Sequence, residues 1–117
     1  MQHRDFIVLK KIVTEMKIGV QLVSDIDKDA FLGDELRKRA GAMTTINVGE
    51  LVKTLTDELR VEYSYVPWRG MAGLRDIAAH RYQTLRMEDI YITITEEFPV
   101  LIKKIEEIIE SEENKEN

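Results

Sequence analysis

Apolar residues recur at intervals of three and four positions along most of this chain, and that spacing restricts the fold more than any other feature. In residues 5–24 the apolar stripe consists of Phe6, Leu9, Val13, Met16, Val20 and Val23. Such a stripe lies along one face of an α-helix, whereas a half-buried strand would alternate apolar and polar residues. Similar stripes predict helices over residues 35–59, 67–82 and 86–110. The sequence therefore predicts an all-α fold, an antiparallel up-and-down bundle of four main helices.

Polar segments separate the predicted helices. Residues 24–29 form the first break, and Gly33-Asp34 form the second, where Asp34 is suited to be the N-cap of the next helix. Residues 60–66 are predicted to be a loop. Pro67 suits the first turn of the third helix, because the N–H that proline lacks would have no helical partner there.

The last predicted helix has one irregular point and a charged end. Pro99 cannot donate the helical hydrogen bond of its position, so we expect a bend or a new helical segment beside it. Residues 111–117 are charged or polar and are expected to fray. Residues 1–110 are therefore expected to form a single helical domain, since a chain of 117 residues fits one compact core.

The composition limits the chemistry available to the chain. It contains no Cys, which excludes disulfides and thiolate metal sites and fits a cytoplasmic protein. No group of His, Asp and Glu has the spacing of a metal site, so we expect neither a metal nor another cofactor. The N-terminus lacks the pattern of a signal peptide, and no apolar run is long enough to span a membrane, so no membrane association is expected.

The net charge of −5 argues against a general nucleic-acid-binding surface. The negative excess, however, lies in residues 96–117, whereas residues 69–86 carry four Arg and one Asp. The sequence is therefore compatible with a local basic site on an acidic protein, where contact with RNA phosphates would depend on salt.

Residues 67–82 hold most of the side chains suited to catalysis. Asp76 and His80 are four positions apart, so on a helix the carboxylate can accept a hydrogen bond from the imidazole and fix its orientation. Arg75 and His80 are five positions apart, and their directions on one helix differ by about 140°. The long Arg75 side chain could swing partway towards His80, or a second copy of the helix could complete the site. On spacing alone, a histidine among surface charges explains the same pattern, because short motifs often match by chance.

The segment Arg75-Asp-Ile-Ala-Ala-His80-Arg-Tyr82 resembles the Arg-x4-His-x-Tyr motif of HEPN-domain proteins, and specifically that of the HepT toxin family. Further matches to the family's pattern are Phe31 to Asp34, Gly49-Glu50, Pro67-Trp68 and Gly73-Leu74. The resemblance extends over nearly the whole chain, from about residue 5 to residue 109.

This resemblance implies a HEPN-like homodimer that cleaves RNA without a metal, at a cleft between two subunits. His80 would take the proton of a ribose 2′-hydroxyl or protonate the leaving oxygen, and Arg75 would hold the scissile phosphate. Asp76 would orient His80, while Arg69 and Arg81 would contact RNA. An alternative function is that of a non-catalytic HEPN module that binds a nucleotidyltransferase partner.

Tyr82 has two interpretations. By itself it is an aromatic residue of the core or of an interface. Proteins of the HepT family are paired with a minimal nucleotidyltransferase antitoxin, and the resemblance implies that such a partner adenylylates Tyr82. A bulky anionic nucleotide near Arg75 would compete with RNA phosphate and block the cleft. The resemblance therefore implies a toxin–antitoxin pair in which this chain is the ribonuclease toxin.

Overall fold

In a computed structural model of the chain, the structure describes the backbone of residues 1–80 and 86–116 and the side chains of residues 1–74 and 86–115. The described residues are helical apart from caps and connections, and none of them belongs to a strand. The elements are α1 (His3–Val23), α2 (Lys28–Leu32), α3 (Glu35–Lys53), α4 (Asp57–Glu62), α5 (Trp68–His80), α6 (Met87–Ile92), the π-helical turn η2 (Thr93–Glu97) and α7 (Phe98–Glu116). The predicted all-α class is confirmed.

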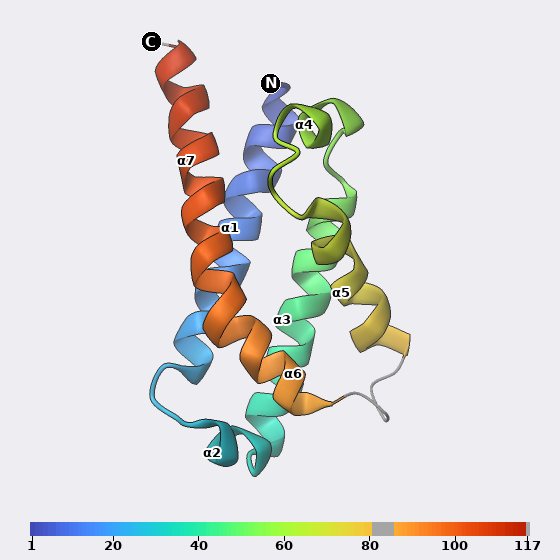
Figure 1. Cartoon of the computed structure of the whole chain (residues 1–117), viewed down its shortest axis with the longest axis vertical. Helices are drawn as coiled ribbons and strands as arrows, with labels where there is room; N and C mark the ends of the chain where they lie inside the picture. Colours follow the sequence, from blue (N-terminus) through green and yellow to red (C-terminus); the bar gives the residue numbers. More distant parts are fainter. Residues whose placement is uncertain (81–85, 117) are drawn as a thin grey trace.

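The long helices lie side by side, with α3 between α1 and α5 (Figure 1). Helix α7 and the turn η2 both pack against α1. The N- and C-termini lie at the same end of the molecule, near α4 (Figure 1). The fully buried apolar residues include Leu9, Ile12, Met16, Phe31, Val48, Ile94, Phe98 and Ile105. Among the described helices, none combines the length and apolar character needed to cross a bilayer.

Gly19 allows α1 to approach two neighbouring helices closely. A Cβ atom at this position would lie 3.0 Å from Thr44 Cγ2 of α3 and 3.3 Å from Phe98 Cε2 of α7. Because the interior is close-packed, a larger residue at position 19 would push these helices apart.

The beginning of α3 agrees with the prediction, but its end does not. Asp34 caps the helix as expected, with its Oδ1 accepting a hydrogen bond from Arg37 N at 3.1 Å. The predicted helix over residues 35–59 is in fact two helices, α3 and α4, and α4 extends into the segment predicted as a loop.

A long-range contact explains this break. The buried Asp5 carboxylate of α1 accepts hydrogen bonds from Thr56 N at 3.0 Å and from Thr56 Oγ1 at 2.6 Å. Thr56 Oγ1 accepts a hydrogen bond from Leu59 N at 3.2 Å and so caps α4. Apolar periodicity does not reveal a partner 51 positions away, and the sequence prediction therefore ran through the break.

The C-terminal segment changes from a π-helical turn to an α-helix beside Pro99. The N–H of Phe98 donates to the Thr93 carbonyl, five residues earlier, and α7 begins directly after this π-helical turn. The expected segment boundary thus falls next to the proline. The helix extends beyond its predicted end at residue 110, because α7 continues to Glu116 and Glu112 is buried within it. Fraying of this end stays a prediction.

Candidate functional site

Helix α5 carries the predicted site, and its first turn is held firmly. Pro67 immediately precedes the helix, and its carbonyl accepts a hydrogen bond from Met71 N at 3.0 Å. Trp68 is buried, and its Nε1 donates to the Tyr63 carbonyl at 3.0 Å. Met71 is also buried in the core. Trp68 is therefore a structural residue of the core.

Tyr63 connects the start of α5 to the end of α7, a role that sequence analysis missed. Its hydroxyl donates a hydrogen bond to Glu112 Oε1 at 2.5 Å. Burial and then the bond to this carboxylate raise the pKa of Tyr63. The Tyr63 hydroxyl and then Lys115 lower the pKa of Glu112, whose carboxylate lies 3.2 Å from Lys115 Nζ. The two partners are 49 positions apart, so no local pattern in the sequence marks the pair.

The predicted catalytic residues occupy the second half of α5. The backbone is helical through His80, so Asp76 and His80 take positions four apart on adjacent turns, and the Arg75 and His80 positions differ by about 140° around the helix. The side chains of these three residues lie outside the described part of the structure, as do Arg81 and Tyr82 entirely. Their contacts therefore stay predictions.

One face of α5 is open. Arg69 is exposed in the first turn, and a Cβ atom at Gly73 would meet none of the described residues within 4 Å. Arg69, Gly73, Asp76 and His80 follow one another at steps of four, three and four, so their positions share this face of the helix. Arg75 lies seven positions after the buried Trp68, so its position on the helix is in line with that residue and not with this face.

The described surface has several grooves, and two of them bear on where RNA could bind; neither of these two is lined by described basic residues of α5. The first, of about 450 Å³, lies between α5 and α7 and has an apolar floor that includes Met71, Leu74 and Leu101. Its rim includes Glu96 and Glu97, whose carboxylates would repel RNA phosphates.

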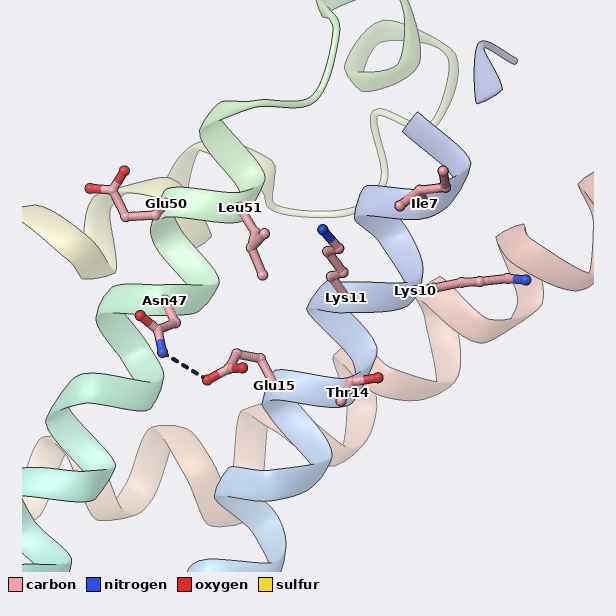
Figure 2. A pocket seen from close by; sticks show the side chains of 8 residues that line it. All are labelled: Ile7, Lys10, Lys11, Thr14, Glu15, Asn47, Glu50 and Leu51. Atoms are coloured by element: carbon pink, nitrogen blue, oxygen red, sulfur yellow. Dashed lines mark hydrogen bonds between the residues drawn. The ribbon is translucent and has the colours of Figure 1, made fainter. Parts of the chain in front are cut away.

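The second groove, of about 540 Å³, lies between α1 and α3 (Figure 2). Figure 2 shows Leu51 and Lys11 directed into the space between the two helices, with Asn47 Nδ2 donating to Glu15 Oε1 at 2.9 Å across one end. This groove is larger but shares no lining residue with α5. We therefore place the candidate RNA surface on the open face of α5 rather than in either groove.

The basic run Arg37 to Arg39 does not offer a free phosphate site. Arg37 donates to Asp25 Oδ1 at 2.7 Å and to the Leu22 carbonyl at 3.0 Å, which fastens the beginning of α3 to the end of α1. The hydrogen bond from Arg37 lowers the pKa of Asp25. Within the described side chains, no three His, Asp or Glu residues come together in a group that could hold a metal ion.

Comparison with known proteins identifies the family. A family model described as "Ribonuclease HepT-like" matches residues 11–108. The chain belongs to the HepT-like ribonuclease family. This result confirms the resemblance found in the motif around Arg75 and His80, and it covers most of the chain.

Individual relatives of this HepT-like chain are similar over most of their length. A protein of Caldanaerobacter subterraneus named "Putative RNase" is 35% identical over 104 residues, which cover 89% of this chain and 93% of the relative. Another of the same name from Methanocaldococcus jannaschii is 37% identical over 101 residues, or 86% of this chain and 84% of the relative. The "Probable ribonuclease HepT" of Thermococcus cleftensis is 26% identical over 106 residues, which cover 91% of this chain and 94% of the relative. No solved structure matches the chain significantly.

Proposed function

We propose that this protein is a metal-independent endoribonuclease, the toxin of a toxin–antitoxin pair that acts in the cytoplasm. The observation that carries the proposal is the spacing of Arg75 and His80 on a helix of a chain that belongs to the HepT-like ribonuclease family. The names of its relatives support RNA as the substrate.

The proposed reaction uses the ribose 2′-hydroxyl of RNA as the nucleophile. The His80 imidazole accepts the proton of that hydroxyl as its oxygen attacks the phosphorus atom. The bond from phosphorus to the 5′ oxygen of the next nucleotide breaks, and an imidazolium protonates the leaving oxygen. The products are a 2′,3′-cyclic phosphate and a free 5′-hydroxyl. Arg75 holds the non-bridging oxygens and stabilises their negative charge, and Asp76 orients His80.

The proposed site is completed in a homodimer of antiparallel four-helix bundles. Arg75 and His80 occupy positions about 140° apart on α5, so a single helix does not direct both groups to one phosphate easily. A second α5 across a shared cleft could supply the missing group. Arg69, which is exposed, and Arg81 would then contact the flanking phosphates of the RNA.

We propose further that a minimal nucleotidyltransferase is the antitoxin. It would transfer AMP from ATP to the Tyr82 hydroxyl and release pyrophosphate, which forms a phosphodiester bond and places a negative charge beside the motif. The adenylyl group would then compete with RNA for Arg75. Incubation with ATP and the transferase should add the mass of AMP to the wild type but not to Tyr82→Phe.

The decisive experiment compares three purified proteins on an RNA substrate in the presence of EDTA. Wild type and the matched control His3→Ala, which changes a histidine far from the motif, should cleave the RNA and leave 2′,3′-cyclic phosphate ends. His80→Ala should be slower by about 10²–10⁴-fold, the usual contribution of a general base. Equal cleavage by His80→Ala, or loss of wild-type cleavage in EDTA, would refute the proposal.

A second function deserves the same test because of the surface charges. The acidic rim at Glu96 and Glu97 and the net charge of −5 favour a non-catalytic module that binds a nucleotidyltransferase. This alternative predicts binding to the transferase without any RNA cleavage by the wild type.

A further inference from the structure

Tyr63 lies at the junction of three helices. Its N–H donates to the Leu59 carbonyl at 3.0 Å at the end of α4. Its carbonyl accepts hydrogen bonds from Val66 N at 3.1 Å and from Trp68 Nε1 at 3.0 Å, so it also holds the residues that lead into α5. Its hydroxyl donates to Glu112 Oε1 of α7 at 2.5 Å. A displacement of Tyr63 would therefore move the start of α5 as well.

Glu112 is a fixed support for this contact. It is 7% exposed, and its carboxylate accepts hydrogen bonds from the Tyr63 hydroxyl and, at 3.2 Å, from Lys115 Nζ. Helix α7, which carries Glu112, packs along α1. A buried carboxylate needs hydrogen-bond donors in place of water. The position of the Tyr63 hydroxyl is therefore constrained from the side of α7.

Packing holds α5 on α3, but a groove lies on its α7 side. Helix α5 packs most extensively against α3. Between α5 and α7 lies the groove of about 450 Å³, which is lined by Met71 on one side and by Val100 and Leu101 on the other. Close packing fixes the distance between two helices, and an open groove supplies little of it along the described residues. The hydrogen bond between Tyr63 and Glu112 supplies a link to α7 just before α5 begins.

We propose that Tyr63 and Glu112 are positioning residues, whose hydrogen bond fixes where α5 begins relative to α7. Through α5 they place the motif of residues 75–80 for RNA cleavage, and this part of the inference rests on the proposed function. Helix α5 is continuous from Trp68 to His80, a length of about 20 Å, so a shift or rotation of its first turn reaches the positions of the motif. A displacement of about 1 Å at a reacting group can slow catalysis by about 10²-fold.

A single tryptophan, Trp68, reports the position of the first turn of α5. Trp68 is 4% exposed and is bonded to the Tyr63 carbonyl. In Tyr63→Phe, which removes only the hydroxyl, Trp68 emission should shift to longer wavelength and acrylamide should quench it more strongly, because the displaced turn admits water. A bond that contributes only to stability would leave the emission of the folded protein unchanged. Spectra are recorded without denaturant, at a temperature where circular dichroism shows every variant folded.

RNA cleavage tests the effect on the motif. The single-turnover rate at saturating RNA should fall by about tenfold in Tyr63→Phe, which is less than the roughly 10²–10⁴-fold expected for His80→Ala. Glu112→Leu removes the acceptor but keeps a side chain of similar size, and it should change emission and rate in the same way. Glu112→Gln retains an acceptor oxygen and should stay closer to the wild type in both measurements. In the double variant of Tyr63→Phe and Glu112→Leu the two losses should not add, since both remove the same bond.

Tyr91→Phe is the matched control. The Tyr91 hydroxyl donates to the Ile26 carbonyl at 3.0 Å, so this variant also loses one tyrosine hydrogen bond, but between α6 and the segment that follows α1. It should leave the Trp68 emission and the cleavage rate unchanged.

Two results would overturn the inference. One is a Trp68 emission in Tyr63→Phe and Glu112→Leu that matches the wild type, and the other is an equal change in the Tyr91→Phe control. If the emission shifts but both variants cleave RNA at the wild-type rate, the bond places α5 without placing the motif, and the catalytic part of the inference is wrong. A wild type that cleaves no RNA refutes the proposed ribonuclease instead, and the emission of the same variants still decides whether this bond positions α5.

Discussion

The buried face and the open face of α5 carry residues with different tasks. On the buried face, Trp68 and Met71 are enclosed, and the Trp68 indole is tied to the Tyr63 carbonyl. On the open face, Arg69 is exposed and Gly73 has free space around its Cα atom. The contrast separates the residues that anchor the helix from the face that holds the positions of Asp76 and His80, which are proposed for catalysis. Changes on the two faces should therefore separate stability from activity.

The largest expected effect is on the buried face. Trp68→Ala should lower the free energy of unfolding by about 3–5 kcal/mol, because it removes a large buried side chain and leaves a cavity. Urea denaturation followed by circular dichroism measures this change. Trp68→Phe keeps most of the packing but loses the Nε1 hydrogen bond, so it should lower the free energy of unfolding by clearly less than Trp68→Ala does. A Trp68→Ala protein as stable as the wild type would show that the buried face does not anchor α5.

The next effect belongs to the open face. Asp76→Asn should slow RNA cleavage by less than the roughly 10²–10⁴-fold expected for loss of a general base, because the proposed role of Asp76 is to orient His80. Stability should change little, since this position follows exposed Arg69 and open Gly73 along the helix. Rates measured as a function of pH, with Asp76→Glu as the variant that keeps the charge, test this. If Asp76→Asn unfolds the protein and leaves the rate per folded molecule unchanged, the assignment of the two faces is reversed.

A smaller effect is expected at Tyr63, which follows α4 and is hydrogen-bonded to Glu112 of α7. Tyr63→Phe should cost about 1 kcal/mol of stability, because it removes the hydrogen bond to Glu112. The pKa of Glu112 is lowered from its ordinary value of 4.5, so its contribution is present above that value and is lost as the pH falls through the folded-state pKa. Tyr63→Phe should therefore lose less stability on acidification than the wild type does. Denaturation midpoints from about pH 7 to about pH 3 measure the difference; parallel curves for the two proteins would show that the pair does not contribute.

The smallest effect compares two glycines. Gly73→Ala should raise stability by about 0.5–1 kcal/mol, because alanine favours the helix and a Cβ atom there meets nothing within 4 Å in the part of the chain that the structure describes. Gly19→Ala should lower stability instead, since the new Cβ atom would lie 3.0 Å from Thr44 Cγ2. Thermal unfolding of both variants checks the sign, and a stabilised Gly19→Ala would mean that α1 is not closely packed at this point.

Local patterns predicted much of the fold. The spacing of apolar residues located the long helices, Asp34 marked the beginning of α3, and Pro67 marked the beginning of α5. The motif from Arg75 to His80 pointed to the family that the comparison confirms. The predicted helix boundaries differ from the structure at positions 54–62 and 111–116, where contacts with side chains far away in the sequence influence the local structure.

The helical class and the family could both be predicted from local spacings, the first from apolar residues three and four positions apart and the second from the motif around Arg75 and His80. Two helix ends depend on tertiary contacts. The break after α3 lies beside Thr56, which is hydrogen-bonded to the buried Asp5 carboxylate. The end of α7 holds Glu112, which is hydrogen-bonded to Tyr63. Tertiary structure also places the apolar residues Leu36 and Met43 of α3 on the outside, where both are exposed. The physical reason is that the spacing of apolar residues tells on which side of a helix they lie. Whether that side is buried depends on which other helix packs against it.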